Sequence, residues 1–377
     1  MKYYIVSGEA SGDLHASNLM KEILKKDPNA KFRCWGGDLM REAGGEVVKH
    51  YKDLNFMGFW EVIKNIRTIF NNLKFCKLDI VQNKPDVLIL VDYPGFNMRI
   101  AKYISNFPIP VIYYISPQVW AWKEKRVEQI RKFVTKLFVI LPFEKEFYKK
   151  HNIDVTYVGH PLIDAIEDFK TSKAVSKADF FKDNDLNDLP IITLLPGSRR
   201  QEIIKKLPIM VSSVNDKIDK FQIVIGGVQL QSDLYKELIN DKRIKVVFND
   251  TYNLLNHSHV ALVTSGTATL ETALFNVPQV VCYKSSWFSY QIAKMLVKNI
   301  KYISLVNLIL NKNSVKELIQ NELTSLNLSR ELDNILSNIN QNEIFEDYKV
   351  LIEKCGGKGA SKLTANELLK TIGFNEI

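Results

Sequence analysis

Short apolar runs separated by amphipathic stretches fill the first half of the chain. Most of these runs are continuous rather than alternating, which is typical of strands that are covered on both faces, as in parallel sheets. The predicted strands are Tyr3–Val6, Phe32–Trp35, Val87–Val91, Val111–Ile115, Leu137–Leu141 and Val155–Val158. Helical spacing lies between them, over Asp13–Lys26, Trp60–Gln82, Met98–Ser105, Lys125–Phe133 and Glu144–Lys150.

The alternation stops in a polar stretch at residues 167–189, which we interpret as a connection between domains. It then resumes, with predicted strands Ile191–Leu195, Gln222–Ile225, Lys245–Phe248, Val260–Thr264 and Val280–Tyr283. Helices are predicted from Arg200, near Ser232–Asn240 and from Thr267. The last ~90 residues are predicted to be helical throughout.

Two successive alternations predict an α/β protein with two Rossmann-like, doubly wound domains that face a cleft, over residues 1–166 and 190–345. A chain of 377 residues, 46% of them hydrophobic, is long enough for two such cores. Ligands of open parallel sheets bind beyond the carboxyl ends of the strands. We therefore expect the functional residues directly after the predicted strands.

Charge and cysteine usage narrow the class of protein. The first 160 residues carry nearly all of the net charge of +9, which favours an anionic partner or surface, although ordinary solvation explains it equally well. No nucleic-acid-binding module is recognisable, so we expect no nucleic acid. The four cysteines are widely spaced, which predicts free thiols in a reducing cytoplasm. We expect no signal peptide, because the first residues read as a strand followed by a turn, and we find no apolar stretch of the roughly 18–20 residues that a membrane span needs.

Two motifs of the first half place carboxylates just after strands. The segment from Ser7 to Asp13, SGEASGD, has two glycines that permit a tight turn before a helix, and we expect it to bind substrate. Asp13 is alternatively a helix N-cap, and the loop as a whole can instead serve only to pack the strand against the helix. Asp92, at the start of DYPGFN, is placed as a general base should be, but an Asx-turn or cap explains it equally well.

The motif SPQVWAW follows the strand Val111–Ile115. Its two tryptophans, Trp120 and Trp122, stand two residues apart in a Pro-containing segment. They can form an apolar wall against a sugar ring or an acyl chain, or they can belong to the core.

The second half has two Gly-containing turns, each between a strand and a helix. The first, LLPGSRR, has arginines at the helix start, which suits a phosphate, and it lacks the Walker pattern of ATP sites. The second, SGTATLE, offers small hydroxyl residues and then Glu271, which can accept hydrogen bonds from a ribose. Two such turns predict a nucleoside diphosphate site. The six histidines show no metal-binding spacing, and GxSxG is absent, so we expect neither a metal nor a serine nucleophile.

These motifs, in this order, resemble the lipid-A-disaccharide synthase family. The resemblance covers residues 1 to about 370 and rests also on Met57-Gly58, LPFE (141–144), VGHPL (158–162), YISLVN (302–307) and VKELIQ (315–320). Val306 departs from the pattern, because the family often has Pro there, and this puts the shape of the loop before Asn307 in doubt.

The resemblance implies a glycosyltransferase-B fold and an inverting, metal-free transfer without a cofactor. It implies that 2,3-diacylglucosamine is transferred from its UDP derivative to 2,3-diacylglucosamine 1-phosphate, called lipid X. Residues 346–377 are then C-terminal helices that pack back on the first domain. The implied location is cytoplasmic, peripherally associated with the inner membrane, where the segment Phe56–Val81 lies in the interface or is instead a core helix with a basic face. The oligomeric state is left open.

Of the expected site residues, Asp92, Arg199, Glu271 and Asn307 match positions of the family, and the others follow from the motifs of this sequence. Asp92 is the expected base, with Glu9 as its rival. The residues expected at the UDP-sugar are Gly197, Ser198, Arg199, Ser265, Gly266, Thr267, Thr269, Glu271 and Asn307. Those expected at the acceptor are Ser11, Asp13, Met57, Asn97, Gln118, Trp120 and Trp122. Two other classes remain open: a non-hydrolysing UDP-N-acetylglucosamine 2-epimerase, and a lipid or nucleotide carrier that does not need Asp92.

Overall fold

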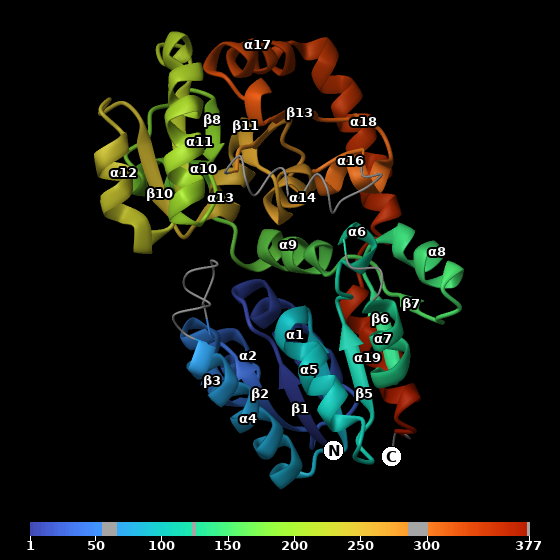
Figure 1. Cartoon of the computed structure of the whole chain (residues 1–377). Coiled ribbons are helices and arrows are strands. Elements are labelled where there is room, and N and C mark those ends of the chain that lie inside the picture. The colour runs from blue at the N-terminus through green and yellow to red at the C-terminus, as the bar shows by residue number, and fades with distance from the viewer. Residues whose placement is uncertain (55–65, 123–125, 286–300, 375–377) are drawn as a thin grey trace. The chain divides into compact units, whose positions relative to one another are not determined.

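The computed structural model describes residues 1–54, 66–122, 126–285 and 301–374 (Figure 1). The chain forms two compact units. The first contains Met1–Ala165 and Cys355–Ile377, and the second contains Ile166–Lys354. Residues 167–189, predicted as a connection, therefore belong to the second unit, and the chain returns to the first unit at 355 rather than at 346.

The first unit is built on a seven-stranded sheet with the order β3-β2-β1-β4-β5-β6-β7. Every pair of neighbours is parallel, as the continuous apolar runs predict. The order runs outward from β1 in both directions, so the sheet is doubly wound. The strands are β1 (Lys2–Val6), β2 (Lys31–Gly36), β3 (Gly45–His50), β4 (Val87–Val91), β5 (Val111–Tyr114), β6 (Lys136–Val139) and β7 (Thr156–Tyr157).

Helices cover both faces of this sheet (Figure 1). Helix α1 packs against α2 and α19 in one layer, while α5 packs against α4 and α7 in the other. The helices are α1 (Ala10–Leu24), α2 (Asp38–Glu42), α4 (Ile66–Asn83), α5 (Pro94–Ile104), α6 (Val119–Trp122), α7 (Val127–Phe133), α8 (Pro142–Lys150) and α19 (Ala360–Thr371), with a 3-10 turn η1 (Tyr51–Leu54).

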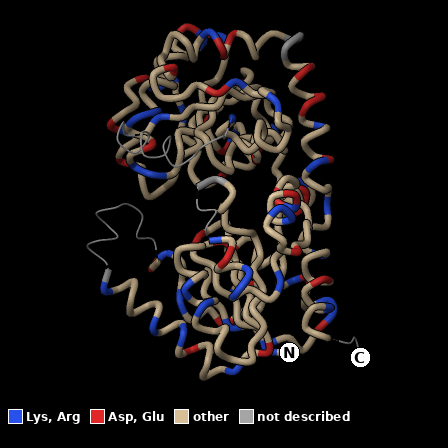
Figure 2. Tube along the Cα trace, turned by 45° about the vertical axis from the view of Figure 1, so that its right-hand side comes forward, with Lys and Arg blue, Asp and Glu red and all other residues tan. Residues whose placement is uncertain are grey.

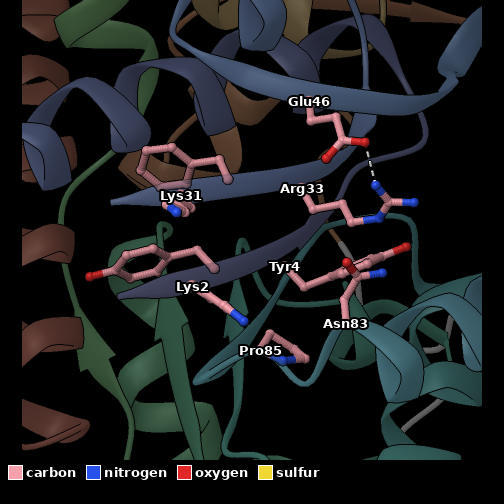
Figure 3. A pocket seen from close by; sticks show the side chains of 9 residues that line it. Lys2, Tyr4, Lys31, Arg33, Glu46, Asn83 and Pro85 are labelled. Atoms are coloured by element: carbon pink, nitrogen blue, oxygen red, sulfur yellow. Dashed lines mark hydrogen bonds and ion pairs between the residues drawn. The ribbon is translucent and has the colours of Figure 1, made fainter. Parts of the chain in front are cut away.

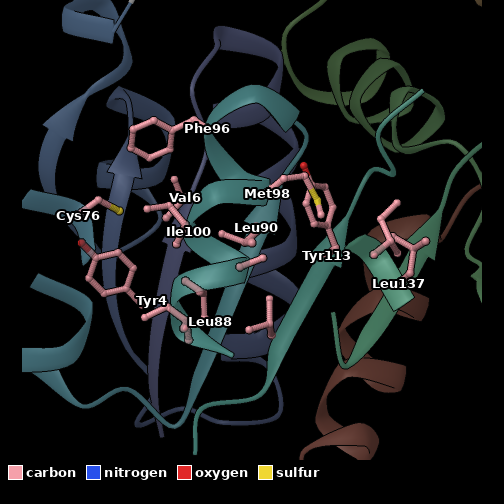
Figure 4. Packing of buried hydrophobic residues seen from close by; sticks show 14 of the residues in the cluster. Tyr4, Val6, Cys76, Leu88, Leu90, Phe96, Met98, Ile100, Tyr113 and Leu137 are labelled. Atoms are coloured by element: carbon pink, nitrogen blue, oxygen red, sulfur yellow. The ribbon is translucent and has the colours of Figure 1, made fainter. Parts of the chain in front are cut away.

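Alternate residues of each strand face the two helical layers. Tyr4 and Val6 of β1 join the core against α4 and α5, together with Leu88 and Leu90 of β4 and Ile100 of α5 (Figure 4). These side chains are fully buried, and so are their neighbours along the strands, which face the opposite way. Burial on both faces is the physical reason for the continuous apolar runs in the sequence.

The second unit repeats the plan with six parallel strands in the order β10-β9-β8-β11-β12-β13. Its strands are β8 (Ile191–Leu195), β9 (Gln222–Gly227), β10 (Lys245–Phe248), β11 (Ser258–Thr264), β12 (Gln279–Tyr283) and β13 (Lys316–Ile319). Its helices are α10 (Lys177–Asp183), α11 (Arg200–Ser213), α12 (Ser232–Leu238), α13 (Thr251–Asn256), α14 (Thr267–Leu274), α16 (Leu305–Leu310), α17 (Ser325–Leu336) and α18 (Asn338–Lys354), with 3-10 turns at Asn215–Lys217, Gln229–Gln231 and Gln320–Glu322. Helix α9 (Pro161–Ser172) contains the boundary between the units.

Two expectations about the second half are wrong. The polar stretch at 167–189 contains the end of α9 and all of α10, because Phe180 and Phe181 bury their rings against the sheet of this unit. The last part of the chain is not helical throughout either, because Lys316–Ile319 forms the edge strand β13 beside β12. No helix in the described part of the chain is both long and apolar enough to cross a bilayer.

Candidate active site

Glu9 and Asp92 follow two neighbouring strands of the first sheet. Strands β1 and β4 pair in parallel with Val6 opposite Leu90, so both carboxylates come from the carboxyl edge of the sheet. Glu9 stands at the N-cap of α1, and its side chain makes no capping bond. Both side chains are partly exposed. The two carboxylates carry like charges, and the charge of Glu9 raises the pKa of Asp92.

Asp92 is held by its backbone in an unusual conformation. Its φ is +45° and that of Tyr93 is +47°, in the left-handed region that non-glycine residues rarely adopt. The Asp92 carbonyl accepts hydrogen bonds from Tyr113 Oη at 2.6 Å and Asn97 Nδ2 at 2.8 Å, and its N–H donates to the Tyr114 carbonyl at 3.0 Å. Because the N–H and the carbonyl of Asp92 are both hydrogen-bonded, the main chain fixes the direction of its carboxylate. A strained backbone held in this way is typical of functional sites.

The environment of Asp92 suits a general base. Burial raises the pKa of its carboxyl to about 7, and the nearby charge of Glu9 adds to the increase. A base whose pKa lies near the working pH is both available and basic enough to take a proton from a hydroxyl. The backbone N–H of Tyr93 counteracts the increase in part.

Gly8 is required beside this turn by close packing. A Cβ on Gly8 would lie 2.4 Å from Cδ1 of Tyr93. The Tyr93 ring therefore lies directly against the SGEASGD backbone, and it also stacks on Phe96 with ring centroids 5.4 Å apart. The two motifs of the first unit thus form one structure.

Two residues expected at the acceptor are structural instead. Asp13 is buried, and its carboxylate accepts from the N–H groups of Gly37, Leu39 and Met40 at 2.7, 3.1 and 3.2 Å, so it caps α2 rather than its own helix. Asn97 is fully buried, and its amide donates to the carbonyls of Val6, Val91 and Asp92. It clamps the ends of β1 and β4 together, which positions Asp92.

The remaining acceptor candidates lie in different surroundings. Ser11 and Gln118 are exposed. Trp120 is partly buried and meets Phe143 edge-on, with ring centroids 4.9 Å apart. Met57 lies outside the described residues, and so does the side chain of Trp122.

Sequence reasoning assigned no role to Glu144, the last residue of LPFE. It is buried, and it accepts from the N–H groups of Ile140 and Leu141 at 3.2 and 3.0 Å at the start of α8. Burial raises the pKa of its carboxyl to about 7, while the hydrogen bonds from that backbone oppose the increase. Glu144 therefore caps the start of α8, and α8 is joined to the SPQVWAW segment by the hydrogen bond between the Ser116 and Tyr148 hydroxyls at 2.7 Å and by the Trp120–Phe143 ring contact.

The two glycine turns of the second unit start side by side. Leu195 of β8 pairs with Val263 of β11, so the turn at 196–199 and the turn at 265–266 leave the same edge of the sheet. Gly197 has φ +110° and Gly266 has φ +148°, and both conformations favour glycine. Each turn leads into a helix start, α11 or α14, where free N–H groups suit a diphosphate. Ser198, Arg199, Gly266 and Thr267 are exposed there, while Ser265 is partly buried and donates to the Ile303 carbonyl.

Thr269 and Asn307 do not offer their side chains to a ligand. Thr269 is fully buried, and its hydroxyl donates to the Gly266 carbonyl at 2.8 Å. Asn307 is fully buried too, and its amide NH2 donates to the Val315 carbonyl and to Glu317, while its oxygen accepts from the N–H groups of Ser314 and Val315. All its hydrogen-bonding capacity is used within the protein.

Glu317 organises the loop that contains Asn307. Its carboxylate accepts from the N–H groups of Ile303 and Ser304 at 3.0 and 2.9 Å and from the Ser304 hydroxyl at 2.7 Å. The same loop presents the Ile303 carbonyl to Ser265. Sequence reasoning identified the VKELIQ motif but not this role, because the partners of Glu317 lie 10 to 14 residues away.

Glu271 lies one turn into α14 in a partly buried position. Tyr252 Oη donates to its Oε1 at 3.0 Å, and the Tyr252 ring packs against Phe169 and Phe275. Burial raises the pKa of the Glu271 carboxyl, and the Tyr252 hydrogen bond opposes the increase. One carboxylate oxygen remains for a ligand hydroxyl.

A cavity of about 160 Å³ lies at the opposite edge of the first sheet, where β1 and β2 begin (Figure 3). Lys2, Lys31 and Arg33 line it, but the guanidinium of Arg33 is paired with Asp79 and Glu46. It is separated from Asp92 by the length of the strands and takes no part in the site.

Comparisons with known proteins give one consistent family. The profile described as Lipid-A-disaccharide synthetase matches residues 3–371. A lipid-A-disaccharide synthase of Geobacter metallireducens is 35% identical over 376 residues, 98% of this chain and 97% of that protein. Lipid-A-disaccharide synthase 1 of Legionella pneumophila is 37% identical over 346 residues, 89% of this chain and 88% of that protein.

Solved structures share the fold at low sequence identity. The UDP-GlcNAc 2-epimerase of Neisseria meningitidis bound to UDP-GlcNAc superposes with a TM-score of 0.72 at 15% identity, covering 98% of this chain and 100% of that one. The S. aureus MnaA-UDP co-structure gives 0.72 at 12% identity, covering 99% and 97%. At such identities the likeness concerns the fold alone, which is the α/β architecture predicted from the sequence.

Proposed function

The chain belongs to the lipid-A-disaccharide synthetase family, and we propose that it condenses UDP-2,3-diacylglucosamine with 2,3-diacylglucosamine 1-phosphate (lipid X). The products are the lipid A disaccharide 1-phosphate and UDP. It is an enzyme of lipid A biosynthesis, and the observation that carries this conclusion is the family match over nearly the whole chain. The reaction forms one glycosidic bond and breaks the bond between the anomeric carbon and UDP.

Asp92 acts as the general base in this proposal. Its carboxylate takes the proton from the attacking hydroxyl of the acceptor while that oxygen bonds to the anomeric carbon of the donor. Support comes from the rigidly held turn and from the pKa of about 7. Glu9 tunes that pKa by its charge and is the rival base.

The second unit binds the UDP part of the donor. The diphosphate binds at the two glycine turns, one formed by Gly197, Ser198 and Arg199 and the other by Ser265, Gly266 and Thr267. The N-terminal ends of α11 and α14 stabilise the negative charge that develops as UDP leaves. Glu271 accepts from the ribose with its remaining oxygen. Asn307 and Thr269 contribute by shaping these turns and not by contact.

The first unit binds the acceptor. Ser11 and Gln118 are the exposed polar groups that can contact the sugar, and Trp120 offers an apolar face to a sugar or an acyl chain. The 1-phosphate of the acceptor and the donor diphosphate are both anionic, in keeping with the positive charge of the first 160 residues.

Helix α4 supplies the peripheral contact with an anionic lipid surface. Phe70, Phe75 and Leu78 are 61%, 45% and 45% exposed, and the exposed basic residues Arg67 and Lys74 share this side at helical spacing. Figure 2 colours the basic positions of the chain blue. Large exposed apolar side chains beside basic ones are typical of interfacial helices. This proposal covers only the described part of the predicted segment Phe56–Val81.

Turnover with UDP-2,3-diacylglucosamine and lipid X, in the presence of EDTA, tests the proposal. We expect disaccharide and UDP in equal amounts, with the metal chelator having no effect. UDP without disaccharide would identify hydrolysis or another acceptor. Epimerisation of UDP-N-acetylglucosamine with no disaccharide would place the chain with the epimerases whose fold it shares.

Vesicle binding tests the lipid contact separately. Phe70→Ser with Phe75→Ser should reduce sedimentation with phosphatidylglycerol vesicles, because it removes the exposed rings of α4. Leu326→Ser is the matched control, since Leu326 is 79% exposed on a helix of the second unit. Equal loss in both proteins, or no loss in either, would exclude α4 as the contact.

A further inference from the structure

Lys206 is a buried cation in the second unit that no motif of the sequence analysis includes. It lies in the second turn of α11, and only 2% of its surface is exposed. Its Nζ donates a hydrogen bond to the Thr264 hydroxyl. Among the described residues, no carboxylate lies within ion-pair distance of this ammonium. A buried lysine without an acidic partner is costly, so its presence calls for an explanation.

The ammonium lies at the edge of the sheet where the two glycine turns begin. Thr264 is the last residue of β11 and immediately precedes Ser265 and Gly266. A helical side chain leans toward the helix N-terminus, which brings the Lys206 amine back toward the start of α11. The charges of Glu202 and Arg199 from that start act on the pKa of this ammonium, and the uncharged thiol of Cys282 on β12 is also near it. The Lys206 ammonium therefore lies on the buried side of the two glycine turns, close to where they begin.

From these contacts we propose that Lys206 is a binding residue for the diphosphate of the sugar nucleotide, supplying a fixed positive charge under the two turns. The inference rests on the proposed function of the second unit and deepens it. The ligand it takes is a nucleoside diphosphate, whose negative charge replaces the missing acidic partner. A charge at the carboxyl edge of β11 stabilises both the bound donor and the departing UDP.

The charge state of Lys206 depends on whether the site is filled. Burial lowers the pKa of its ammonium in the free protein, and the charge of Glu202 opposes this decrease. A bound diphosphate would raise that pKa again, because an anion favours the charged form. By linkage, UDP affinity should be constant while Lys206 is protonated and should fall as the pH rises through its lowered pKa.

The test compares UDP binding by the wild-type protein with that of Lys206→Met, which keeps the length of the side chain but removes its charge. Titration calorimetry should give a Kd at least about tenfold higher for the variant. Lys205→Met is the matched control, because Lys205 is the preceding residue of the same helix and is partly exposed. Thermal unfolding without ligand should be unchanged or shifted upward in Lys206→Met, since a buried charge is removed.

The possible outcomes distinguish two claims, the proposed UDP site of the second unit and the role of Lys206 in it. A wild-type protein that does not bind UDP would overturn both the proposed donor site and this inference. Normal UDP binding by Lys206→Met, or an equal loss in Lys205→Met, would overturn the inference alone. If Lys206→Met does not fold, the pH dependence of UDP affinity in the wild-type protein decides. The range to measure runs from pH 7 to about pH 10, just below the ordinary pKa of a lysine. A UDP affinity that does not fall in this range would overturn the inference.

Discussion

Asp92 and Glu9 are both carboxylates at the end of a parallel strand, but their backbones differ. Asp92 is fixed by three hydrogen bonds to its main chain in a left-handed turn, whereas Glu9 is the extended N-cap residue of α1. A base must keep its geometry while its charge changes during the reaction. The hydrogen-bonded turn provides that rigidity for Asp92, which is why we assign it the proton transfer.

Replacing Asp92 by Asn should abolish most of the turnover while leaving the substrates bound. The amide has the same shape but takes no proton, so kcat should fall by about 10²–10⁴-fold with a small change in KM. Steady-state kinetics with both substrates measures this. Asp38→Asn, a change of an exposed carboxylate on α2, is the control. Retained turnover in Asp92→Asn would exclude it as the base and favour Glu9.

Glu9→Gln should change the pH profile. A base works when it has lost its proton, so kcat/KM of the wild-type protein should fall as the pH drops below about 7, the raised pKa of Asp92. Burial is the main cause of that value and the Glu9 charge is the next. Removing this charge should move the fall in activity to lower pH. An unshifted profile, or complete loss of activity at every pH, would contradict this role for Glu9.

The sequence predicted polar residues just after the strands of each sheet, but it did not show what each of them does there. A polar residue after a strand can face a ligand or satisfy the backbone, and the pattern is the same for both. Asp13 caps a helix 24 to 27 residues further on, and Asn97 bridges to Val6, 91 residues away. Lys206 belongs to no motif of the sequence, and nothing in the sequence distinguishes it from the preceding, partly exposed Lys205. These distinctions depend on tertiary contacts.

At the scale of elements, the short helix α2 depends on one carboxylate from another helix. It has five residues, and its N-cap is Gly37, which has no side chain to cap it. Asp13 of α1 supplies the missing acceptor to three N–H groups. The same helix α1 follows the SGEASGD turn, so the cap also links that turn to β2 and its neighbours.

Asp13→Ala should destabilise the protein by about 3 kcal/mol, because it leaves three N–H groups at the start of α2 without their acceptor. Urea unfolding followed by circular dichroism measures the change. Asp38→Ala is the control, since Asp38 lies in the same helix with an exposed side chain. A loss below about 1 kcal/mol would mean that water replaces the cap, and the structural role assigned to Asp13 would then be wrong.

The elements that sequence analysis missed share a physical reason. Strand β13 is an edge strand with a pattern of Lys, Glu, Leu and Ile, and β3 at the other sheet's edge includes Glu46 and Lys49. Edge strands are covered less fully, so their sequences lack the continuous apolar run that revealed the central strands. Helix α10 was hidden for a different reason: only Phe180 and Phe181 of its seven residues are buried.

At the scale of the whole molecule, the chain passes between its two units twice, after Ala165 and after Lys354. Within the first unit, Asp164 links the segment just before the first crossing to the segment just after the second. It is buried near the start of α9, and its carboxylate accepts from the N–H groups of Gly359 and Ser361 at 2.6 and 2.8 Å, at the start of α19. Helix α19 in turn packs on α1, the helix that begins within the SGEASGD motif. The C-terminus is therefore part of the first unit, to which we assign the acceptor in our proposal.

Asp164→Ala should loosen the first unit and spare the second. Without its cap, α19 should open more often, so amides of α19 and of the facing side of α1 should exchange with solvent at least about tenfold faster, as a loss of about 1.4 kcal/mol or more implies. Amides of β8 and β11 should keep their protection, and UDP affinity should be unchanged, because the two glycine turns that we propose for UDP belong to the second unit. Glu167→Ala, one turn later on α9, is the control. Faster exchange throughout both units would show that they unfold together, and the stability of the C-terminal helix would then control the donor site as well.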